Sequence, residues 1–214
     1  MFDRIAGVYD LMNRVMTAGL DQRWRRRAVD LARVGPGSRA LDVATGTGDL
    51  AVALRDAGAE VVGCDFSEEM MERGRAKAPG VRFEWADALA LPYEDDSFDA
   101  ATVGFGARNF SNLGTGLREM VRVVRPGGRV VVLEITTPQR RPLSSFYSFW
   151  FDRLVPALGR LAGDPDAYSY LPNSVKRFPG PEALAGELAA AGLTEVHWIL
   201  TAGGIIAIHA GTVA

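Results

Sequence analysis

The sequence predicts an α/β fold built on a mostly parallel sheet of seven strands, with helices on both faces and one strand running antiparallel. Three observations predict it. Short apolar runs alternate with helical segments from about residue 38 to residue 135. Only a glycine pair separates the last two apolar runs, which is too short for a parallel crossover. The chain has 214 residues, 48% apolar and 23% charged, as expected for one soluble globular domain.

The first part of the sheet follows from alternating strand and helix signals. The helical segment 46–58 ends at Gly58, the residue type favoured just past a helix. Ser67 offers a side-chain cap to the segment 68–78, and two glutamates fill the first turn of that helix. Strands alternating with helices form βαβ units, so this part of the sheet should be parallel. The seven strands are predicted at 39–45, 60–65, 81–87, 98–106, 128–135, 195–202 and 204–211.

The remaining helices are predicted from their end signals. Residues 112–124 carry helical periodicity, and the turn 125–128, Arg-Pro-Gly-Gly, opens the following strand. The segment 181–192 begins with a proline and ends with a glycine, the order expected for a helix. We therefore predict one domain, 1–214, with N-terminal helices at 2–33 and a cap insertion at 138–178.

Charge and cysteine content bound the class of protein. The net charge of -2 gives no indication of a nucleic-acid partner, and we interpret the cluster Arg23 and Arg25–Arg27 as the solvent face of a helix. The single cysteine, Cys64, excludes an intrachain disulfide and indicates a reducing compartment. The first ten residues lack the apolar core of a secretory signal, and no apolar run approaches the about 20 residues of a membrane span. We expect a cytoplasmic protein that could contact a membrane from its inner face.

A glycine-rich turn follows the first strand and indicates a nucleotide-like ligand. Gly46 and Gly48 would let the backbone approach a ligand at the start of a helix. The spacing also fits the dinucleotide fingerprint, with Ala51 in the third position. Asp65, at the end of the second strand, suits ribose hydroxyls in either case. The turn alone therefore leaves a nicotinamide cofactor and S-adenosylmethionine open.

Three further features favour S-adenosylmethionine. Asp42 lies on the first strand just before the turn, where a carboxylate would repel a pyrophosphate but suits an ammonium group. Asp87 and Ala88 follow the third strand, where they could hold an adenine edge. The antiparallel pair at the end of the sheet is the third feature. The alternative for each aspartate is a helix cap or a turn former, and no cluster of side chains with the spacing of metal ligands is present.

The chain resembles the menaquinone and ubiquinone biosynthesis C-methyltransferases. The resemblance extends over nearly the whole chain, and FGARN and YSYLPNSV are its most diagnostic parts. It implies a Rossmann-like, class I S-adenosylmethionine-dependent methyltransferase that acts on a ring carbon of a polyprenylated quinol. The motifs are YDLMN followed by Trp24, LDVATGTGDLA, CDFSEEMM, LPYEDDSFDAATVGFGARN, REMVRVVRPGGRVVVLEI, YSYLPNSVKRFP and GGIIAIHAG.

The resemblance also implies roles for individual residues. Thr47 and Gly48 would contact the methionine part of the cofactor, and Gly104 would lie beside the sulfonium. The full cofactor-binding set is Asp42, Gly46, Thr47, Gly48, Asp65, Phe66, Asp87, Ala88 and Gly104. Asp21 departs from the family, which often has histidine there. The start at Met1 also departs from relatives, which usually have further residues before it, so a shortened or misassigned start is one interpretation.

Four residues are candidates for the chemistry. A quinol carbon becomes nucleophilic when a neighbouring hydroxyl ionises, and such a phenol has a pKa near about 10, so a fixed cation would help. We predict that Arg108 stabilises the phenolate and that Asn109 orients the ring or the loop. The alternative is that Arg108 pairs with an acid and braces the loop. The resemblance places Tyr9 and Asp10 over the mouth of the site, with packing and surface roles as alternatives.

Other features have a structural and a functional interpretation. His197 and His209 lie in apolar strands, and we predict structural roles for both. Residues 142–162 carry an apolar stripe at helical spacing, which predicts either packing of the cap or a groove for a polyprenyl tail at a bilayer. The predicted reaction is conversion of demethylmenaquinol to menaquinol. Another aromatic acceptor, a nicotinamide oxidoreductase and a non-catalytic subunit are the alternatives.

Overall fold

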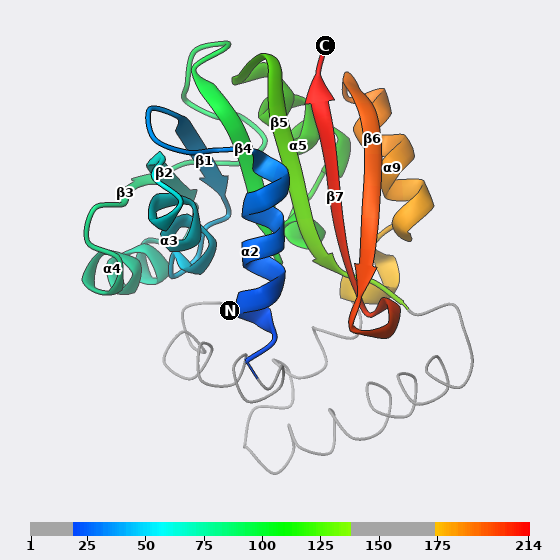
Figure 1. Cartoon of the computed structure of the whole chain (residues 1–214), viewed down its shortest axis with the longest axis horizontal. Helices are drawn as coiled ribbons and strands as arrows, with labels where there is room; N and C mark the ends of the chain where they lie inside the picture. Colours follow the sequence, from blue (N-terminus) through cyan, green and yellow to red (C-terminus); the bar gives the residue numbers. More distant parts are fainter. Residues whose placement is uncertain (1–18, 138–173) are drawn as a thin grey trace.

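The computed structural model describes residues 19–137 and 174–214, and it has the predicted α/β architecture (Figure 1). One seven-stranded sheet has the order β3-β2-β1-β4-β5-β7-β6. Pairing is parallel from β3 to β5, whereas β7 runs antiparallel to both of its neighbours. The strands are β1 (Arg39–Val43), β2 (Glu60–Asp65), β3 (Arg82–Trp85), β4 (Phe98–Gly104), β5 (Val124–Ile135), β6 (Leu193–Thr201) and β7 (Ile206–Val213).

Helices cover both faces of the sheet (Figure 1). Alternate residues of β1 show why, because Ala40 packs with α2 and α3 whereas Leu41 packs with α5 and α9. Strands that are apolar on both faces are expected in a parallel sheet. The helices are α2 (Asp21–Ala32), α3 (Asp49–Asp56), α4 (Glu68–Lys77), α5 (Leu113–Arg122) and α9 (Pro181–Ala190), with 3-10 turns η1 (Ala107–Asn109) and η3 (Ala202–Gly204).

Two element boundaries differ from the predicted ones for identifiable reasons. Helix α3 begins at Asp49 rather than at residue 46, because the preceding glycines adopt positive φ and cannot continue a helix. Strand β5 begins at Val124 rather than at residue 128. The Arg-Pro-Gly-Gly sequence therefore forms an irregularity inside the β4–β5 pairing, between Phe98 and Ala100 of β4.

Helix α2 confirms part of the predicted N-terminal helices and corrects the interpretation of their basic cluster. Three of its four arginines, Arg23, Arg26 and Arg27, are exposed as predicted. Arg25 is buried, with 9% of its surface accessible, so its assignment to the solvent face was wrong. The helix buries the face that carries Trp24, and Arg25 lies beside this residue.

Several predictions lie outside the described residues. They are Tyr9, Asp10 and the helices expected before residue 19, together with the insertion up to residue 173. Within the ranges 19–137 and 174–214, no helix is long and apolar enough to cross a membrane.

Close contact between α4 and β3 yields a prediction on stability. A Cβ atom added at Gly74 in α4 would lie 2.5 Å from Cε1 of the Phe83 ring in β3. Alanine is the better helix former by about 0.8–1 kcal/mol, but overpacking a core costs about 1–3 kcal/mol. We therefore expect Gly74→Ala to lower the free energy of unfolding by roughly 1 kcal/mol, measured by urea denaturation.

The matched control is Gly186→Ala in α9, where an added Cβ would have nothing within 4 Å. Here only the helix propensity changes, so the variant should be more stable than the parent by up to about 1 kcal/mol. If the two variants shift the unfolding midpoint in the same direction, the close α4–β3 contact does not have the stated effect.

Candidate functional site

A cavity of about 350 Å³ opens at the carboxyl ends of β1, β2, β3 and β4. Parallel strands bring these ends to one edge of the sheet, which is where ligands bind in open α/β folds. Eight of the nine residues predicted to bind the cofactor line this cavity, and the ninth, Gly48, is not among the described lining residues. The described lining residues are Arg25, Asp42, Ala44, Thr45, Gly46, Thr47, Asp49, Leu50, Asp65, Phe66, Ser67, Met70, Trp85, Ala86, Asp87, Ala88, Leu89, Gly104, Phe105, Gly106, Asn109, Phe110 and Ser111.

The glycine-rich turn leads directly from β1 into α3. Gly46 has φ +57° and Gly48 has φ +84°, a region that residues with a side chain adopt at a cost. The Gly48 amide donates to the Thr45 carbonyl at 2.9 Å, which closes the turn. A Cβ at Gly48 would also lie 2.7 Å from the Phe83 ring. The turn thus brings bare backbone to the cavity at the start of a helix.

Asp42 is a buried carboxylate whose two oxygens each accept a hydrogen bond from a hydroxyl group. Thr45 Oγ1 donates to Asp42 Oδ2 and Thr102 Oγ1 donates to Asp42 Oδ1, both at 2.7 Å. Burial raises the pKa of Asp42 to about 6, although the two hydroxyls and the positive charge of Arg25 act in the opposite direction. A buried carboxylate of this kind is stabilised by an incoming cation.

Asp65 connects two elements of the cavity wall. Its Oδ2 accepts from the Gly46 amide at 2.8 Å, and its Oδ1 accepts from the Ser67 amide at 2.9 Å. The carboxylate therefore orders both the glycine-rich turn and the start of α4, which matches the turn-forming alternative. It also lines the cavity, where it can accept further hydrogen bonds.

Two exposed aromatic rings lie at the cavity. Phe66 is 58% exposed and Trp85 is 62% exposed. The Trp85 indole N–H donates to the Phe66 carbonyl oxygen at 3.0 Å, so the Trp85 side chain fixes the backbone of Phe66. Trp85 was not predicted as a site residue, although its position at the end of the third strand was a usable signal. Apolar rings facing water at a cavity are typical of a binding surface.

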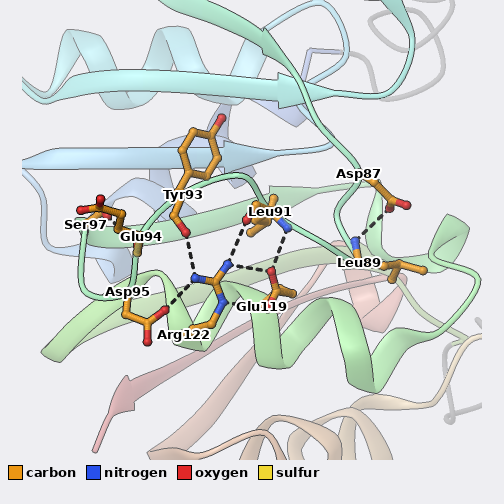
Figure 2. A network of polar contacts seen from close by, with 9 residues as sticks. All are labelled: Asp87, Leu89, Leu91, Tyr93, Glu94, Asp95, Ser97, Glu119 and Arg122. Atoms are coloured by element: carbon orange, nitrogen blue, oxygen red, sulfur yellow. Dashed lines mark hydrogen bonds and ion pairs between the residues drawn. The ribbon is translucent and has the colours of Figure 1, made fainter.

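The loop after β3, which carries Asp87 and Ala88, is held from outside the cavity (Figure 2). Arg122 Nη2 donates to the Leu91 carbonyl at 2.9 Å, and Arg122 Nη1 donates to the Tyr93 carbonyl at 2.8 Å. Glu119, ion-paired to Arg122 at 2.8 Å, accepts from the Leu91 amide. The pair lowers the pKa of Glu119, because the carboxylate form receives these hydrogen bonds. Helix α5 thus sets the position of a cavity wall that it does not line.

The loop after β4 contains the predicted catalytic pair, and the structure separates its members. Asn109 lines the cavity, whereas Arg108 is not among the described lining residues. Arg108 Nη1 lies 2.7 Å from Glu134 Oε1, and the two side chains are 6% and 1% exposed. The guanidinium also donates to the Phe105 carbonyl. These are the contacts expected of the loop-bracing alternative, and the phenolate role stays a prediction.

Arg25 is a second residue of the cavity lining that was not predicted from the sequence. Its guanidinium pairs with Asp21 and lies 3.2 Å from Asp49 Oδ2, and its Cζ lies 5.9 Å from the centre of the Phe105 ring. Asp21, the departure from the family pattern, is 3% exposed and is used to hold this arginine. Nothing in the local spacing distinguished Arg25 from its exposed neighbours.

The histidines lie away from the cavity lining. His209 is fully buried in β7, and its Nε2–H donates to the Pro181 carbonyl at 2.8 Å. Burial lowers its pKa, so it is neutral at pH 7 and its ring stacks on Trp198. On the exposed edge strand, the Nδ1–H of His197 donates to the Glu195 carbonyl oxygen at 2.9 Å. Among the residues that the structure describes, no group of three or more potential ligands could hold a metal ion.

The charges of the cavity decide which ligand it suits. The described lining carries four carboxylates, from Asp42, Asp49, Asp65 and Asp87, and one guanidinium, from Arg25. A pyrophosphate would meet mainly negative groups. An amino acid joined to a nucleoside would instead find a cation for its carboxylate, a carboxylate for its ammonium group, and further carboxylates that accept hydrogen bonds from the ribose hydroxyls. The residues present therefore fit S-adenosylmethionine better than a dinucleotide.

Comparison with known proteins agrees with this assignment. The profile of the ubiE/COQ5 methyltransferase family matches residues 1–213. The chain is 50% identical to "Demethylmenaquinone methyltransferase" of Thermus thermophilus, over 99% of both chains. It is 42% identical to "Ubiquinone/menaquinone biosynthesis C-methyltransferase UbiE" of Geobacter sulfurreducens, over 99% of this chain and 86% of the relative.

Solved structures show the same fold at low sequence identity. A SAM-dependent methyltransferase of Thermotoga maritima, titled a possible histamine N-methyltransferase, has a TM-score of 0.69 at 21% identity, covering 99% of this chain and 97% of that one. The protein titled "the putative methyltransferase" in a complex with the Haloferax volcanii Trm112 methyltransferase activator has a TM-score of 0.72 at 19% identity, covering 99% of this chain and 96% of that one. The predicted Rossmann-like fold, cofactor and enzyme class are confirmed, and the chain belongs to the ubiE/COQ5 methyltransferase family.

Proposed function

We propose that the chain transfers the methyl group of S-adenosylmethionine to a ring carbon of a polyprenylated quinol, converting a demethylmenaquinol to a menaquinol. The observation that carries the proposal is the 50% identity over 99% of both chains to a protein named demethylmenaquinone methyltransferase. The cavity supports it, because its acidic and aromatic lining suits an amino-acid nucleoside. Another aromatic acceptor for the same methyl group is the alternative.

The residues of the cavity would divide the cofactor among them. Asp42 would accept hydrogen bonds from the ammonium group, and Asp65 would accept from the ribose hydroxyls. Asp87 and Ala88 would take the adenine edge, with Phe66 against its face. Thr47 and Gly48 would contact the methionine part. When bound, S-adenosylmethionine supplies a methyl group that positive sulfur has already activated, so the protein's main contribution is positioning, worth roughly 7–11 kcal/mol in well-oriented reactions.

The loop after β4 would position the acceptor ring. A Cβ at Gly104 would lie 3.1 Å from a methyl carbon of Leu50, so glycine keeps this wall open. Asn109 lines the cavity and can donate to or accept from a ring oxygen. The buried Arg108–Glu134 pair holds the loop at its base, and we propose that Arg108 acts as a positioning residue. Tyr9 and Asp10 remain predicted contributors to ring contact and proton removal.

The polyprenyl tail of the substrate needs an apolar surface in addition to the cavity described above. We propose that the apolar stripe at 142–162 lines a groove for the tail, or rests on the bilayer that contains the quinol, from the cytoplasmic side. Support comes from the helical spacing of its aromatic and leucine side chains. Comparing tailed and tailless acceptors in the assay that follows tests this.

The proposed reaction is tested with methyl-labelled S-adenosylmethionine and chemically reduced demethylmenaquinol in liposomes. We expect a label on a ring carbon of the extracted lipid, identified by mass spectrometry. We also expect faster turnover for the polyprenylated acceptor than for a tailless naphthoquinol. Cofactor binding without any labelled quinol would move the proposal to another acceptor, and equal rates on both acceptors would contradict the groove.

The role of Arg108 is tested in a pair of variants, because removing it alone would leave buried Glu134 without its ion-pair partner. The double variant Arg108→Met/Glu134→Gln removes both charges, and Glu134→Gln alone keeps the arginine. If Arg108 positions the loop, kcat should fall about tenfold or more in the double variant while the pH dependence of kcat stays unchanged. A shift of that profile to higher pH, seen only in the double variant, would instead assign Arg108 the predicted stabilisation of the phenolate.

The raised pKa of Asp42 predicts how cofactor binding depends on pH. An ammonium group needs the ionised carboxylate, which is lost as pH falls through about 6. We expect the Kd for S-adenosylhomocysteine to rise below that pH by about tenfold per unit. Asp42→Asn should weaken binding at pH 8 by roughly 10–100-fold and remove the pH dependence. The exposed control Asp30→Asn should retain the parent profile in calorimetry.

The same residue makes an opposite prediction for stability. A carboxyl whose folded pKa is raised favours the folded state when protonated, so this contribution is complete below the unfolded value of about 4 and disappears as pH rises through about 6. The parent should therefore lose stability relative to Asp42→Asn across this window, by an amount on the order of 2–3 kcal/mol. Parallel stability curves for the two proteins would show that Asp42 does not carry the buried charge.

A further inference from the structure

Arg25 is placed at one end of the cavity by two helices. It lies in α2, before the first strand, and its ion-pair partners are Asp21 at the start of α2 and Asp49 at the start of α3. The contact to Asp21 spans one helical turn, and the contact to Asp49 joins the two helices. The guanidinium is therefore fixed in position rather than free to sample solvent.

The surroundings of Arg25 identify which end of the cavity this is. Its Cζ lies over the Phe105 ring, which follows β4, and its charge influences the carboxylate of Asp42 on β1. Asp49 directly follows the glycine-rich turn. The aromatic residues Phe66 and Trp85 belong instead to the ends of β2 and β3. Because the sheet order is β3-β2-β1-β4, Arg25 and those rings lie at opposite sides of the cavity.

Arg25 has hydrogen-bond capacity beyond its present partners. A guanidinium has five N–H donors in a planar fork, and the two ion pairs engage Nη1 and Nη2. It is also the one cationic side chain among the described residues of the cavity lining, facing a wall that is otherwise acidic. A ligand carboxylate that enters this end of the cavity has no other cation in that lining to contact.

We propose that Arg25 binds the carboxylate of the cofactor's amino-acid group and so determines that the site takes a zwitterion rather than a simple nucleoside thioether. This inference rests on the proposed function, in which Asp42 takes the ammonium group. Opposite charges at Asp42 and Arg25 match the two charges carried on the α-carbon of the methionine part. Charge-assisted contacts to a planar carboxylate are the kind that arginine makes best.

Asp21 has a supporting role in this arrangement. It is 3% exposed and lies four residues before Arg25, so it holds the guanidinium toward the cavity. Removing Arg25 alone would take away the ion-pair partner of this buried carboxylate, which is strongly destabilising. A test of binding therefore has to remove both charges and compare the result with removal of Asp21 alone.

The experiment measures Kd by titration calorimetry for two probes. S-adenosylhomocysteine carries the amino-acid group, and 5′-methylthioadenosine has the same adenosine and sulfur without it. The test protein is Asp21→Asn/Arg25→Gln, and Asp21→Asn alone is the reference that keeps Arg25. Arg23→Gln, an exposed arginine on the same helix, is the matched control for loss of one positive charge. Thermal unfolding of each variant verifies that it is folded.

We expect the double variant to bind S-adenosylhomocysteine roughly 10–100-fold more weakly than Asp21→Asn, the loss of one hydrogen-bonded charge contact. Binding of 5′-methylthioadenosine should change less than twofold, and Arg23→Gln should affect neither probe. Equal weakening of both probes would mean that Arg25 only supports the cavity wall, and an unchanged Kd for S-adenosylhomocysteine would also overturn the inference. Failure of the unmodified protein to bind either probe would instead overturn the proposed function itself.

Discussion

The cavity depends on one buried carboxylate, that of Asp42, and on the two threonine hydroxyls that donate hydrogen bonds to it. Asp42 and Thr102 are register partners on β1 and β4, so the parallel pairing itself sets their hydrogen bond. Thr45 adds the second bond from the chain that leaves β1 for the glycine-rich turn. The side chain of Asp42 thus connects the β1–β4 pairing to the glycine-rich turn and places a negative charge between them. Burying the charge of Asp42 costs free energy, and an incoming cation offsets that cost. The same residue therefore lowers the stability of the ligand-free protein and favours binding of a cationic ligand.

A second constraint is the position of the two cavity walls that the loops after β3 and β4 form. Each is held by an arginine–glutamate pair placed behind the loop. Arg122 and Glu119 fix the backbone around Leu91 from α5, and Arg108 and Glu134 fix the loop that carries Asn109 from β5. The residues that face the ligand therefore differ from those that position them, and the pairs leave the cavity lining free for ligand contacts.

Much of this could be predicted from the sequence, and the reasons for the rest are physical. The strands, the glycine-rich turn and the aspartates at strand ends follow from periodicity and from the rule that carboxyl ends of parallel strands meet at one edge. The Arg108–Glu134 pair joins residues 26 positions apart, and Arg25 meets Asp49 across two helices, so neither contact leaves a local signal. The basic cluster on α2 looked uniform because helical spacing alone does not show which arginine the sheet covers. Trp85 was not predicted as a site residue, because a tryptophan at the end of a strand is equally compatible with packing in the core.

The hydrogen bond from the Trp85 indole to the Phe66 carbonyl keeps two aromatic rings facing water at the rim of the cavity, 62% and 58% exposed. Surface of this kind is hydrated until something covers it, and removal of apolar surface from water lowers the heat capacity of the system. Ligand entry against these rings should accordingly have a calorimetric signature that the polar contacts lack. The enthalpy of association would become more negative as temperature rises, with a slope that reports how much of the two rings the ligand covers.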